Sequence, residues 1–478
     1  LYVGNSKGLG SYSDERGPHS PLAADGKDEG RGSVKSLQKG TVQMIGLGNL
    51  RSDIKAWTKQ VYENTPYKDE FLARAKAPGG ESIVPRDVGV GSPIKHVIYI
   101  IRENRTYDQV MGDMPKGNGD PRIAIFGKNV TPNGHAIADQ YVLFDNLYCD
   151  GEVSVDGHSW SNSAYATDYN EKLWPLTYGG HSKASYTLAN LPPGGNMWEL
   201  ARRKGLTYRS YGEYTTRSSD STRMEAIPGI AALVGHVAPM FKLPGMRDTD
   251  NVKAFIAEFD EFEKNYEVKD PSKRLPNMIV MSLAENHTQG TRPGARTPSA
   301  MVANNDYAVG MLVDRVTHSR YWPETAIFII EDDAQDGSDH VDARRTVGLV
   351  ISPYIKRGTV DSTLYTTSGM LRTMQLLLGL PPMSQFDAAA MPMYNAFGTK
   401  ADLSAYTHVT PMIDVNETNT ATAWGAKESL AMNLDEVDEA PMFALNEIIW
   451  KSVKGADSPM PLPVHRYWFH PQSSRAAR

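Results

Sequence analysis

The sequence has almost no cysteine, no long apolar run and no excess of positive charge. Cys149 is the only cysteine among 478 residues, which excludes an internal disulfide bond and a cysteine-rich zinc site. No run of about eighteen apolar residues is present, so no transmembrane segment is expected. The net charge of -6 and the pI of about 6.1 provide no basic footprint for nucleic acid. With 40% hydrophobic residues, the chain can bury a large core in more than one domain.

The first 60 residues differ from the rest of the chain. Two short strands are predicted, Leu1–Asn5 and Gly40–Leu47, with a surface loop rich in Gly, Ser and Pro over Ser6–Ser33. Because two lone strands do not form a stable unit, residues 1–60 are interpreted as the end of a repeat domain whose remainder is missing. The start at Leu1, without a methionine or a signal peptide, indicates a processed or truncated piece.

Beyond a linker at residues 61–93, strands and helices alternate. Candidate core strands are His96–Ile101, Tyr141–Asn146, Tyr208–Glu213, Met278–Leu283, Thr325–Ile330 and Val347–Ser352. Helical spacing covers Leu50–Ala77, Ser159–Asp168, Met197–Lys204, Asn251–Tyr266, Pro298–His318 and Thr367–Leu378. This alternation predicts an α/β main domain at 94–455, with a mostly parallel sheet between helices. Within it, 170–275 is a candidate cap or insertion, and 456–478 is a surface tail. Tyr169–Pro193, a candidate wall over the site, and Tyr394–Thr422 are expected to be irregular.

Acidic residues follow two of the predicted strands. Ile330–His340 contains Glu331, Asp332, Asp333, Asp336, Asp339 and His340. Such a cluster is either a solvated loop or a site where a cation offsets the charges. Glu103 and Asn104 follow the strand His96–Ile101, although Asn104 could also cap a helix. Carboxyl ends of parallel strands face ligand crevices, so Glu103, Asn104, Asp332 and Asp333 together suit a divalent cation.

Histidines and serines near other strand ends could complete such a site. His287 follows Met278–Leu283, and His340 lies seven residues after Asp333; both could bind a metal or a phosphoryl oxygen, although a lone histidine is more often structural. Ser154, Ser159 and Ser161 follow Tyr141–Asn146. A serine at a helix N-terminus could become a nucleophile beside a metal ion, and the alternative for each serine is a helix cap.

Several ordered motifs resemble the bacterial phosphoesterase family, which contains phospholipase C-type and acid phosphatase enzymes of the alkaline phosphatase superfamily. They include H-V-I-Y-I-I-R-E-N-R-T-Y-D, A-E-N-H-T-Q-G-T, N-N-D-Y-A-V-G, I-F-I-I-E-D-D-A-Q-D-G-S-D-H-V-D and R-R-T-V-G-L-V-I-S-P-Y, from about residue 94 to about residue 395. The resemblance implies an alkaline phosphatase-like fold and a metal-dependent hydrolase of phosphoric esters with a phosphoseryl intermediate. It also implies the following roles: metal ligands Glu103, Asn104, Asp332 and Asp333; nucleophile Ser154, four residues before the imidazole of His158 as in superfamily relatives; and phosphate or second-metal contacts His287 and His340. His158, His287 and His340 are the candidates that stabilise oxygens or protonate the leaving group.

Departures from the family pattern narrow this expectation. Ser154–His158 differs from the T-D-P-N-R-like turn of phospholipase C-type members, so an acid phosphatase-like enzyme is expected, with a phospholipase C-type phosphodiesterase as the alternative. Leu283 stands where two-metal relatives have aspartate, which favours one metal, and the turn after Cys149 lacks the sulfatase pattern. The ion would be Zn, Ca, Mn or Mg, or iron if histidine takes part.

A second resemblance concerns the N-terminus. L-Y-V-G-N-S-K-G-L-G-S and G-T-V-Q-M-I resemble the closing part of a YVTN-type β-propeller. The expected partners are therefore a phosphate-ester substrate and a propeller portion of the same precursor. The main resemblance implies a periplasmic or secreted location. A rival interpretation is a non-catalytic binding protein that is stabilised by a metal ion.

Overall fold

A five-stranded sheet forms the centre of the computed structural model, which describes residues 1–5, 41–64, 81–180, 188–434 and 438–465. The strand order is β11-β10-β3-β9-β6. The bounds are β3 His96–Arg102, β6 Tyr208–Tyr211, β9 Met278–Ser282, β10 Thr325–Glu331 and β11 Gly348–Ile351. Every residue of β3, β9, β10 and β11 is buried, as expected for strands that are covered on both faces.

Four of these strands run in the same direction. β10 pairs with β3 in parallel, with Glu331 opposite Arg102, and β3 pairs with β9, with Ile101 opposite Ser282. β6 continues the parallel order beside β9, whereas β11 is an antiparallel edge strand. The expectation of a mostly parallel α/β sheet is therefore confirmed, and the carboxyl ends of β6, β9, β3 and β10 lie at one edge.

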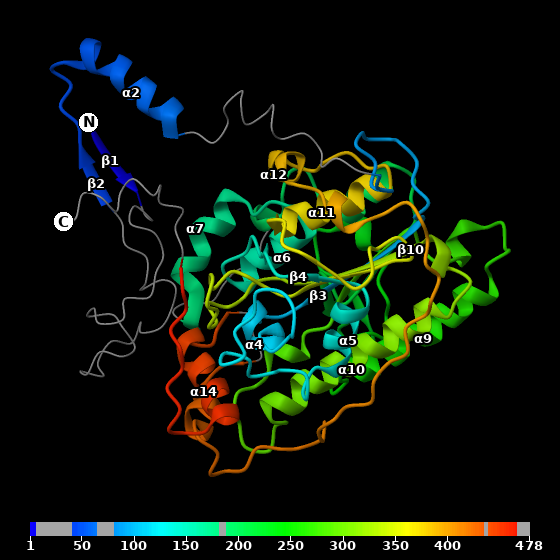
Figure 1. Cartoon of the computed structure of the whole chain (residues 1–478). Coiled ribbons are helices and arrows are strands. Elements are labelled where there is room, and N and C mark those ends of the chain that lie inside the picture. Colours follow the sequence, from blue (N-terminus) through cyan, green and yellow to red (C-terminus); the bar gives the residue numbers. More distant parts are fainter. Residues whose placement is uncertain (6–40, 65–80, 181–187, 435–437, 466–478) are drawn as a thin grey trace.

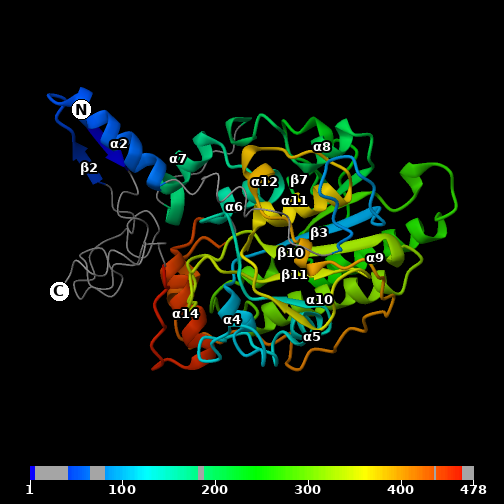
Figure 2. The same ribbon diagram turned by 45° about the horizontal axis from the view of Figure 1, so that its top comes forward.

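Helices cover both faces of the sheet, which Figures 1 and 2 show from two directions. One layer contains α5 Pro132–Gln140, α9 Asp248–Lys264 and α10 Pro298–Thr317; the other contains α6 Ser154–Ser163, α11 Thr367–Leu377 and α12 Gln385–Ala389. The remaining α-helices of the main part are α4 Tyr107–Met111, α7 Asp168–Thr177, α8 Met197–Arg203, α13 Ala426–Ala431 and α14 Met442–Lys454.

Two expectations need correction. The predicted core strand Tyr141–Asn146 contains β4 Val142–Phe144, which lies outside the central sheet and pairs with β12 Thr359–Asp361. A short buried apolar run does not identify its partner, so the sequence pattern alone could not reveal this. The second concerns Tyr169–Pro193, expected to be irregular, most of whose first half is α7. The Thr167 side chain caps this helix by accepting a hydrogen bond from the Asn170 amide at 3.2 Å.

Helix α6 also begins earlier than expected, at Ser154 rather than at Ser159. Tyr394–Thr422 contains only a single 3₁₀ turn, Tyr394–Ala396, so its irregular character is confirmed. Residues 456–465 form neither helix nor strand, and 466–478 lie outside the described residues.

The N-terminal elements lie to one side of the α/β body in Figures 1 and 2. β1 Tyr2–Asn5 and β2 Thr41–Met44 pair in an antiparallel manner, and α2 Leu50–Asn64 has no buried residue. The predicted loop Ser6–Ser33 and the continuation of the predicted helix Leu50–Ala77 past residue 64 lie outside the described residues. The propeller resemblance and the domain boundaries remain predictions.

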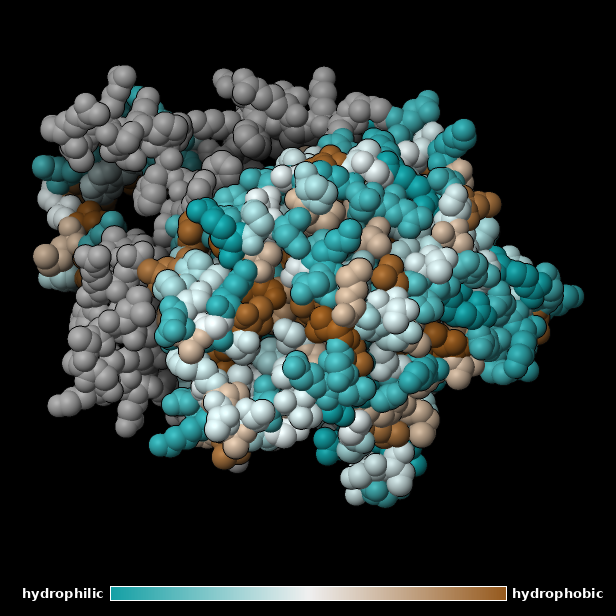
Figure 3. Space-filling view, turned by 60° about the horizontal axis from the view of Figure 1, so that its bottom comes forward, coloured by the Kyte–Doolittle hydropathy of each residue, from teal (hydrophilic) through white to brown (hydrophobic). Residues whose placement is uncertain are grey.

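The face of the main part that Figure 3 shows is largely polar. On the face in Figure 3, apolar residues lie in small separate areas among hydrophilic ones. None of the helices in the described ranges combines the length and apolar composition that crossing a bilayer requires.

Candidate active site

Two pairs of predicted metal ligands lie at the carboxyl edge of the sheet. Glu103 and Asn104 follow β3, and Asp332 and Asp333 follow the neighbouring β10. Asn104 has a φ of 69°, in the left-handed region that asparagine tolerates better than most residues. Both aspartates are fully buried, at 0% exposure. The alternative of a solvated acidic loop does not fit this burial.

Ser154 lies against these acids at the first turn of α6. Its Oγ donates a hydrogen bond to Asp333 Oδ2 at 2.9 Å and accepts one from Asn104 Nδ2 at 3.3 Å. Ser159 Oγ instead accepts from Asn170 Nδ2 at 3.2 Å, and Ser161 lies beside Tyr99. Of the three candidate serines, Ser154 is therefore the one that contacts the predicted metal ligands.

Two glycines allow α6 to approach the end of β10. A Cβ on Gly157 would lie 2.8 Å from the Asp332 carbonyl oxygen, and one on Gly151 would lie 2.4 Å from the Gly157 Cα. Real Cβ atoms do not come so close to backbone atoms, because hard-sphere contacts forbid it. The absence of these side chains brings Ser154 within reach of Asp333.

His158 lies one helical turn after Ser154 and between three carboxylates. Its Nε2 is 3.6 Å from both Glu103 Oε1 and Asp332 Oδ2, while its Nδ1 is 3.3 Å from Glu213 Oε2. Burial lowers the pKa of His158, but Glu213, Glu103 and Asp332 outweigh it and raise this pKa well above its usual value. His158 therefore carries a positive charge toward the acids.

The charges around Glu103 also favour its ionised form. Burial raises the pKa of Glu103, but the nearby imidazole of His158, 3.6 Å away, and the charges of His287 and Lys242 lower it to about 2. The carboxylate is therefore ionised at neutral pH and available as a ligand.

The oxygens of Asp332 test whether these residues fit a metal ion. Both are buried and have no hydrogen-bond partner among the described residues; His158, at 3.6 Å, is beyond hydrogen-bond range. Burial and the neighbouring Asp333 raise the pKa of Asp332 well above its usual value, and burial and Asp438 do the same for Asp333. Paired buried carboxylates with unsatisfied oxygens suit a hard divalent cation, so the donor set fits.

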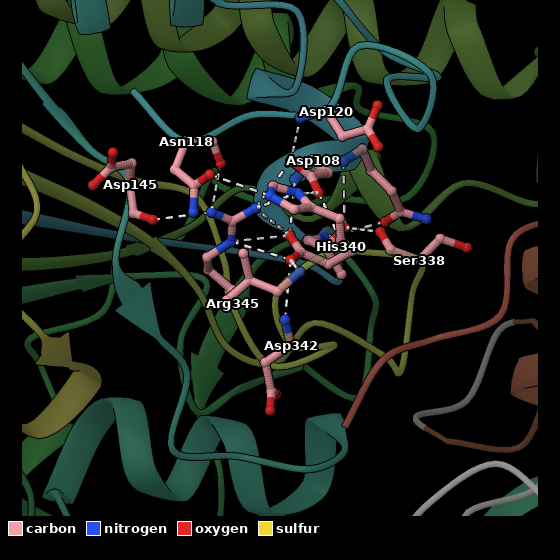
Figure 4. Close-up of polar contacts among 12 residues, drawn as sticks. Asp108, Asn118, Asp120, Asp145, Ser338, His340, Asp342 and Arg345 are labelled. Carbon is pink, nitrogen blue, oxygen red and sulfur yellow. Dashed lines mark hydrogen bonds and ion pairs between the residues drawn. The ribbon is translucent and has the colours of Figure 1, made fainter. Parts of the chain in front are cut away.

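The two other predicted histidines lie in different places. His287, in the 3₁₀ turn Glu285–His287 after β9, is close enough to influence the Glu103 carboxyl. The described contacts of His340 lead elsewhere, because its Nδ1 is 2.5 Å from Asp108 Oδ2 and its Nε2 is 3.2 Å from Asn118 Oδ1 (Figure 4). The structure therefore brings His158 to the site, leaves His287 within electrostatic range of Glu103, and places His340 in a separate cluster.

This second cluster has acids and a histidine within metal-binding distance. Asp108, Asp339 and His340 have ligand atoms within 4.8 Å of one another. However, the fully buried guanidinium of Arg345 donates to Asp108 Oδ1 at 2.9 Å (Figure 4). It also donates to Asp339 Oδ2 at 3.1 Å. Arg345 thus already supplies the positive charge that a metal ion would bring.

A cavity of about 610 Å³ opens beside Ser154. Glu103, His158 and Lys242 line its polar part, and Leu173 and Trp174 of α7 contribute an apolar wall. The segment expected to cover the site therefore does so through a helix.

Three residues at the site were not identified from the sequence. Glu213 is the last residue of the predicted strand Tyr208–Glu213 and lies two residues after β6 ends, so the pattern of an acid at a strand end could have found it. Asp438 accepts hydrogen bonds from the amides of Ser154 and Val155 at 3.1 and 2.7 Å. Neither Asp438 nor Lys242 has a sequence signal, because each reaches the site from a distant irregular segment.

The model of the phosphoesterase family matches residues 123–381, more than half of the chain. No curated protein matches it.

Solved structures resemble the chain at low identity. A protein of the alkaline phosphatase superfamily from Vibrio parahaemolyticus is 18% identical, with 61% of this chain and 68% of that chain covered and a TM-score of 0.41. The C-terminal periplasmic domain of EptC from Escherichia coli is 13% identical, with 64% and 87% covered and a TM-score of 0.38. Human ectonucleotide pyrophosphatase/phosphodiesterase 5 is 11% identical, with 60% and 96% covered and a TM-score of 0.35.

Proposed function

Because the chain belongs to the phosphoesterase family, it is a hydrolase of phosphate esters, and we propose that it works in the manner of an acid phosphatase through a phosphoseryl intermediate on Ser154. The observation that carries this proposal is the position of Ser154 Oγ, 2.9 Å from Asp333 and beside Asn104. A hydroxyl at a helix N-terminus, next to a buried acceptor and a donor set that fits a cation, is arranged as an activated nucleophile.

In the first step, Ser154 Oγ forms a bond to phosphorus while the bond to the leaving oxygen breaks. The serine proton passes to Asp333, which already accepts its hydrogen bond. A divalent cation held by Glu103, Asn104, Asp332 and Asp333 would supply Lewis acidity that stabilises charge on the phosphoryl oxygens and lowers the pKa of the serine hydroxyl.

His158 shares one face of α6 with Ser154, four residues later, so it lies on the nucleophile's side of the phosphorus. Its role is therefore to stabilise phosphoryl oxygens, and His287 is the candidate that protonates the leaving oxygen. In the second step, water attacks phosphorus and gives a proton to His287, while the bond from phosphorus to Ser154 Oγ breaks and Ser154 takes back the proton held by Asp333, which releases phosphate.

The donor set accommodates more than one kind of metal ion. Carboxylate and amide oxygens suit calcium, magnesium or manganese, whereas participation of an imidazole would favour zinc or iron. Elemental analysis of protein purified without added metal identifies the ion. Activity should fall on chelation and return with that ion; activity that persists after complete metal removal would contradict the metal-dependent mechanism.

Replacing the serine tests the nucleophile. Ser154→Ala should lower kcat for an aryl phosphate by roughly 10³-fold or more, as losses of a covalent nucleophile do, while the metal content stays unchanged. Ser159→Ala, on the same helix but bonded to Asn170, is the matched control. Rapid acid quenching followed by mass spectrometry should locate the phosphoryl group on Ser154. Near-normal turnover of Ser154→Ala, or a phosphoryl group on another serine, would reject the assignment.

A phospholipase C-type phosphodiesterase is the second candidate, and the apolar wall of Leu173 and Trp174 favours it. Comparing a diacyl phospholipid with a simple monoester separates the two candidates. If neither substrate is cleaved and chelation only lowers thermal stability, the chain is a metal-stabilised binding protein instead. We also propose a periplasmic or secreted location, on the basis of the sequence resemblance, and cell fractionation tests it.

A further inference from the structure

Lys242 places an ammonium group in the cavity that holds Ser154 and Glu103. Its Nζ donates a hydrogen bond to Ser282 Oγ at 2.6 Å, and Ser282 is the last residue of β9 and also lines the cavity. The lysine comes from an irregular segment between β8 Met224–Ala226 and α9, yet its charge lies at the carboxyl edge of the sheet.

The backbone around Lys242 is shaped to deliver this side chain. Lys242 has a φ of 60°, a left-handed conformation that is unfavourable for a lysine, and the Asn251 side chain holds it by accepting from the Lys242 amide at 2.8 Å. Gly212 leaves room for the stem, because a Cβ there would lie 2.8 Å from Lys242 Cδ. Strained residues held by their surroundings are concentrated at functional sites.

The ammonium has no carboxylate within ion-pair distance among the described residues, although it lies in an acidic region. Its charge acts on Glu213. Burial raises the pKa of Glu213, but His158 and, to a smaller extent, Lys242 lower it, so that this pKa lies below its usual value. The contact with Ser282 is to a neutral hydroxyl, which a stronger anionic acceptor could replace or share. A cation held in this way, facing a reaction cavity, is available to a substrate.

We propose that Lys242 binds a non-bridging oxygen of the substrate phosphoryl group and makes the site selective for phosphate monoesters over diesters. This inference rests on the proposed function. A monoester dianion has three non-bridging oxygens, whereas a diester has two and a single charge. The buried carboxylates around Ser154 repel a dianion. A cation in addition to His158 is therefore needed to offset the second negative charge of the monoester. In a diester, one ester oxygen with its substituent takes the place of an anionic oxygen.

The test compares 4-nitrophenyl phosphate with bis(4-nitrophenyl) phosphate in Lys242→Met, which keeps the apolar stem and removes the charge. The value of kcat/KM for the monoester should fall roughly 10- to 100-fold, as expected for loss of a charged hydrogen bond, while the value for the diester changes less than about 3-fold. Lys242→Arg should restore most of the monoester activity. Lys253→Gln removes a lysine from the exposed side of α9, where it pairs with Asp250, and should change neither activity.

An equal loss on both esters would overturn the inference, since a lysine that only keeps Glu103 and Glu213 ionised would affect both substrates alike. If Lys242→Met does not fold, Ser282→Ala decides, because it removes the hydroxyl that orients the ammonium and should lower only the monoester value. If the wild type cleaves neither ester, the proposed function fails. The role of Lys242 is then tested by measuring the binding of phosphate compounds. Tighter binding of orthophosphate than of diethyl phosphate, lost in Lys242→Met, supports the inference, and equal binding rejects it.

Discussion

Glu213 should act as a positioning residue for His158, and Glu213→Gln tests this. The carboxylate is buried at 2% exposure, and its Oε2 accepts a hydrogen bond from Asn162 Nδ2 at 2.9 Å while facing His158 Nδ1 at 3.3 Å. Glutamine has nearly the same shape and can still accept from Asn162. The substitution therefore removes the charge that faces the imidazolium and leaves the packing in place.

The size of the effect follows from the kind of contact. A hydrogen bond to a charged group contributes about 1.5–3 kcal/mol, against about 0.5–1.5 kcal/mol for a neutral one. The difference, roughly 1–2 kcal/mol, corresponds to about a 5- to 30-fold loss of kcat. Because His158 contacts the phosphoryl group in the proposed mechanism, the loss should appear in kcat more than in KM.

A double-mutant cycle with His158→Asn isolates the coupling between Glu213 and His158. Steady-state kinetics on an aryl phosphate, with metal content measured for every variant, should show that Glu213→Gln has little further effect once His158 is gone. Glu225→Gln, at an exposed strand position, is a control for the loss of one acid. The same loss in both backgrounds, or a loss explained by reduced metal content, would refute the positioning role.

Two further predictions concern stability. Arg345→Met should lower the free energy of unfolding by about 3–5 kcal/mol in denaturant titrations, because Asp108 and Asp339 would keep buried uncompensated charges. Added divalent cations should not restore the lost stability. Full rescue by a metal ion would show that this cluster is a cation site instead. Burial lowers the pKa of His96 from 6.5 to about 4, so the unfolded chain takes up a proton first on acidification, and stability that is present above pH 6.5 is lost toward pH 4. His96→Asn should remove up to about 3 kcal/mol of this loss, and an unchanged pH profile would contradict the interpretation.

The sequence revealed the parts of the fold that carry strong local patterns. β3 and β10 were recognisable because buried parallel strands are continuous β-branched and aromatic runs, and the acids after them marked the edge of the sheet. β4 has a similar apolar run, but pairing is a long-range property that such a run does not encode. The same limit applies to β11, whose antiparallel direction depends on the path of the preceding loop.

At the site, the sequence could indicate residue types but not partners. Asp332 and Asp339 belong to the same acidic stretch. Asp332 lies beside His158 at the site, whereas Asp339 is neutralised by Arg345. His340 was paired with His287 because it lies in the acidic stretch after a strand, seven residues past Asp333, and His287 also follows a strand end. Their different positions arise from turns and distant charges, which spacing along the chain does not reveal.

The close approach of α6 to β10 has a consequence for motion. Since the Gly157 Cα lies against the Asp332 carbonyl, a shift of the helix must push the loop that holds Asp332, and the serine and its neighbouring acids will move as one body. Trp174 of α7 packs in one apolar cluster with Val153 and Val155, the neighbours of Ser154, so this part of the cavity wall moves with the helix. Room for a bulky ester must therefore come from the rest of the lining, at residues 214–216 and at Ile227 and Pro228. Entry of the substrate and the geometry of the catalytic residues therefore depend on different segments of the cavity lining.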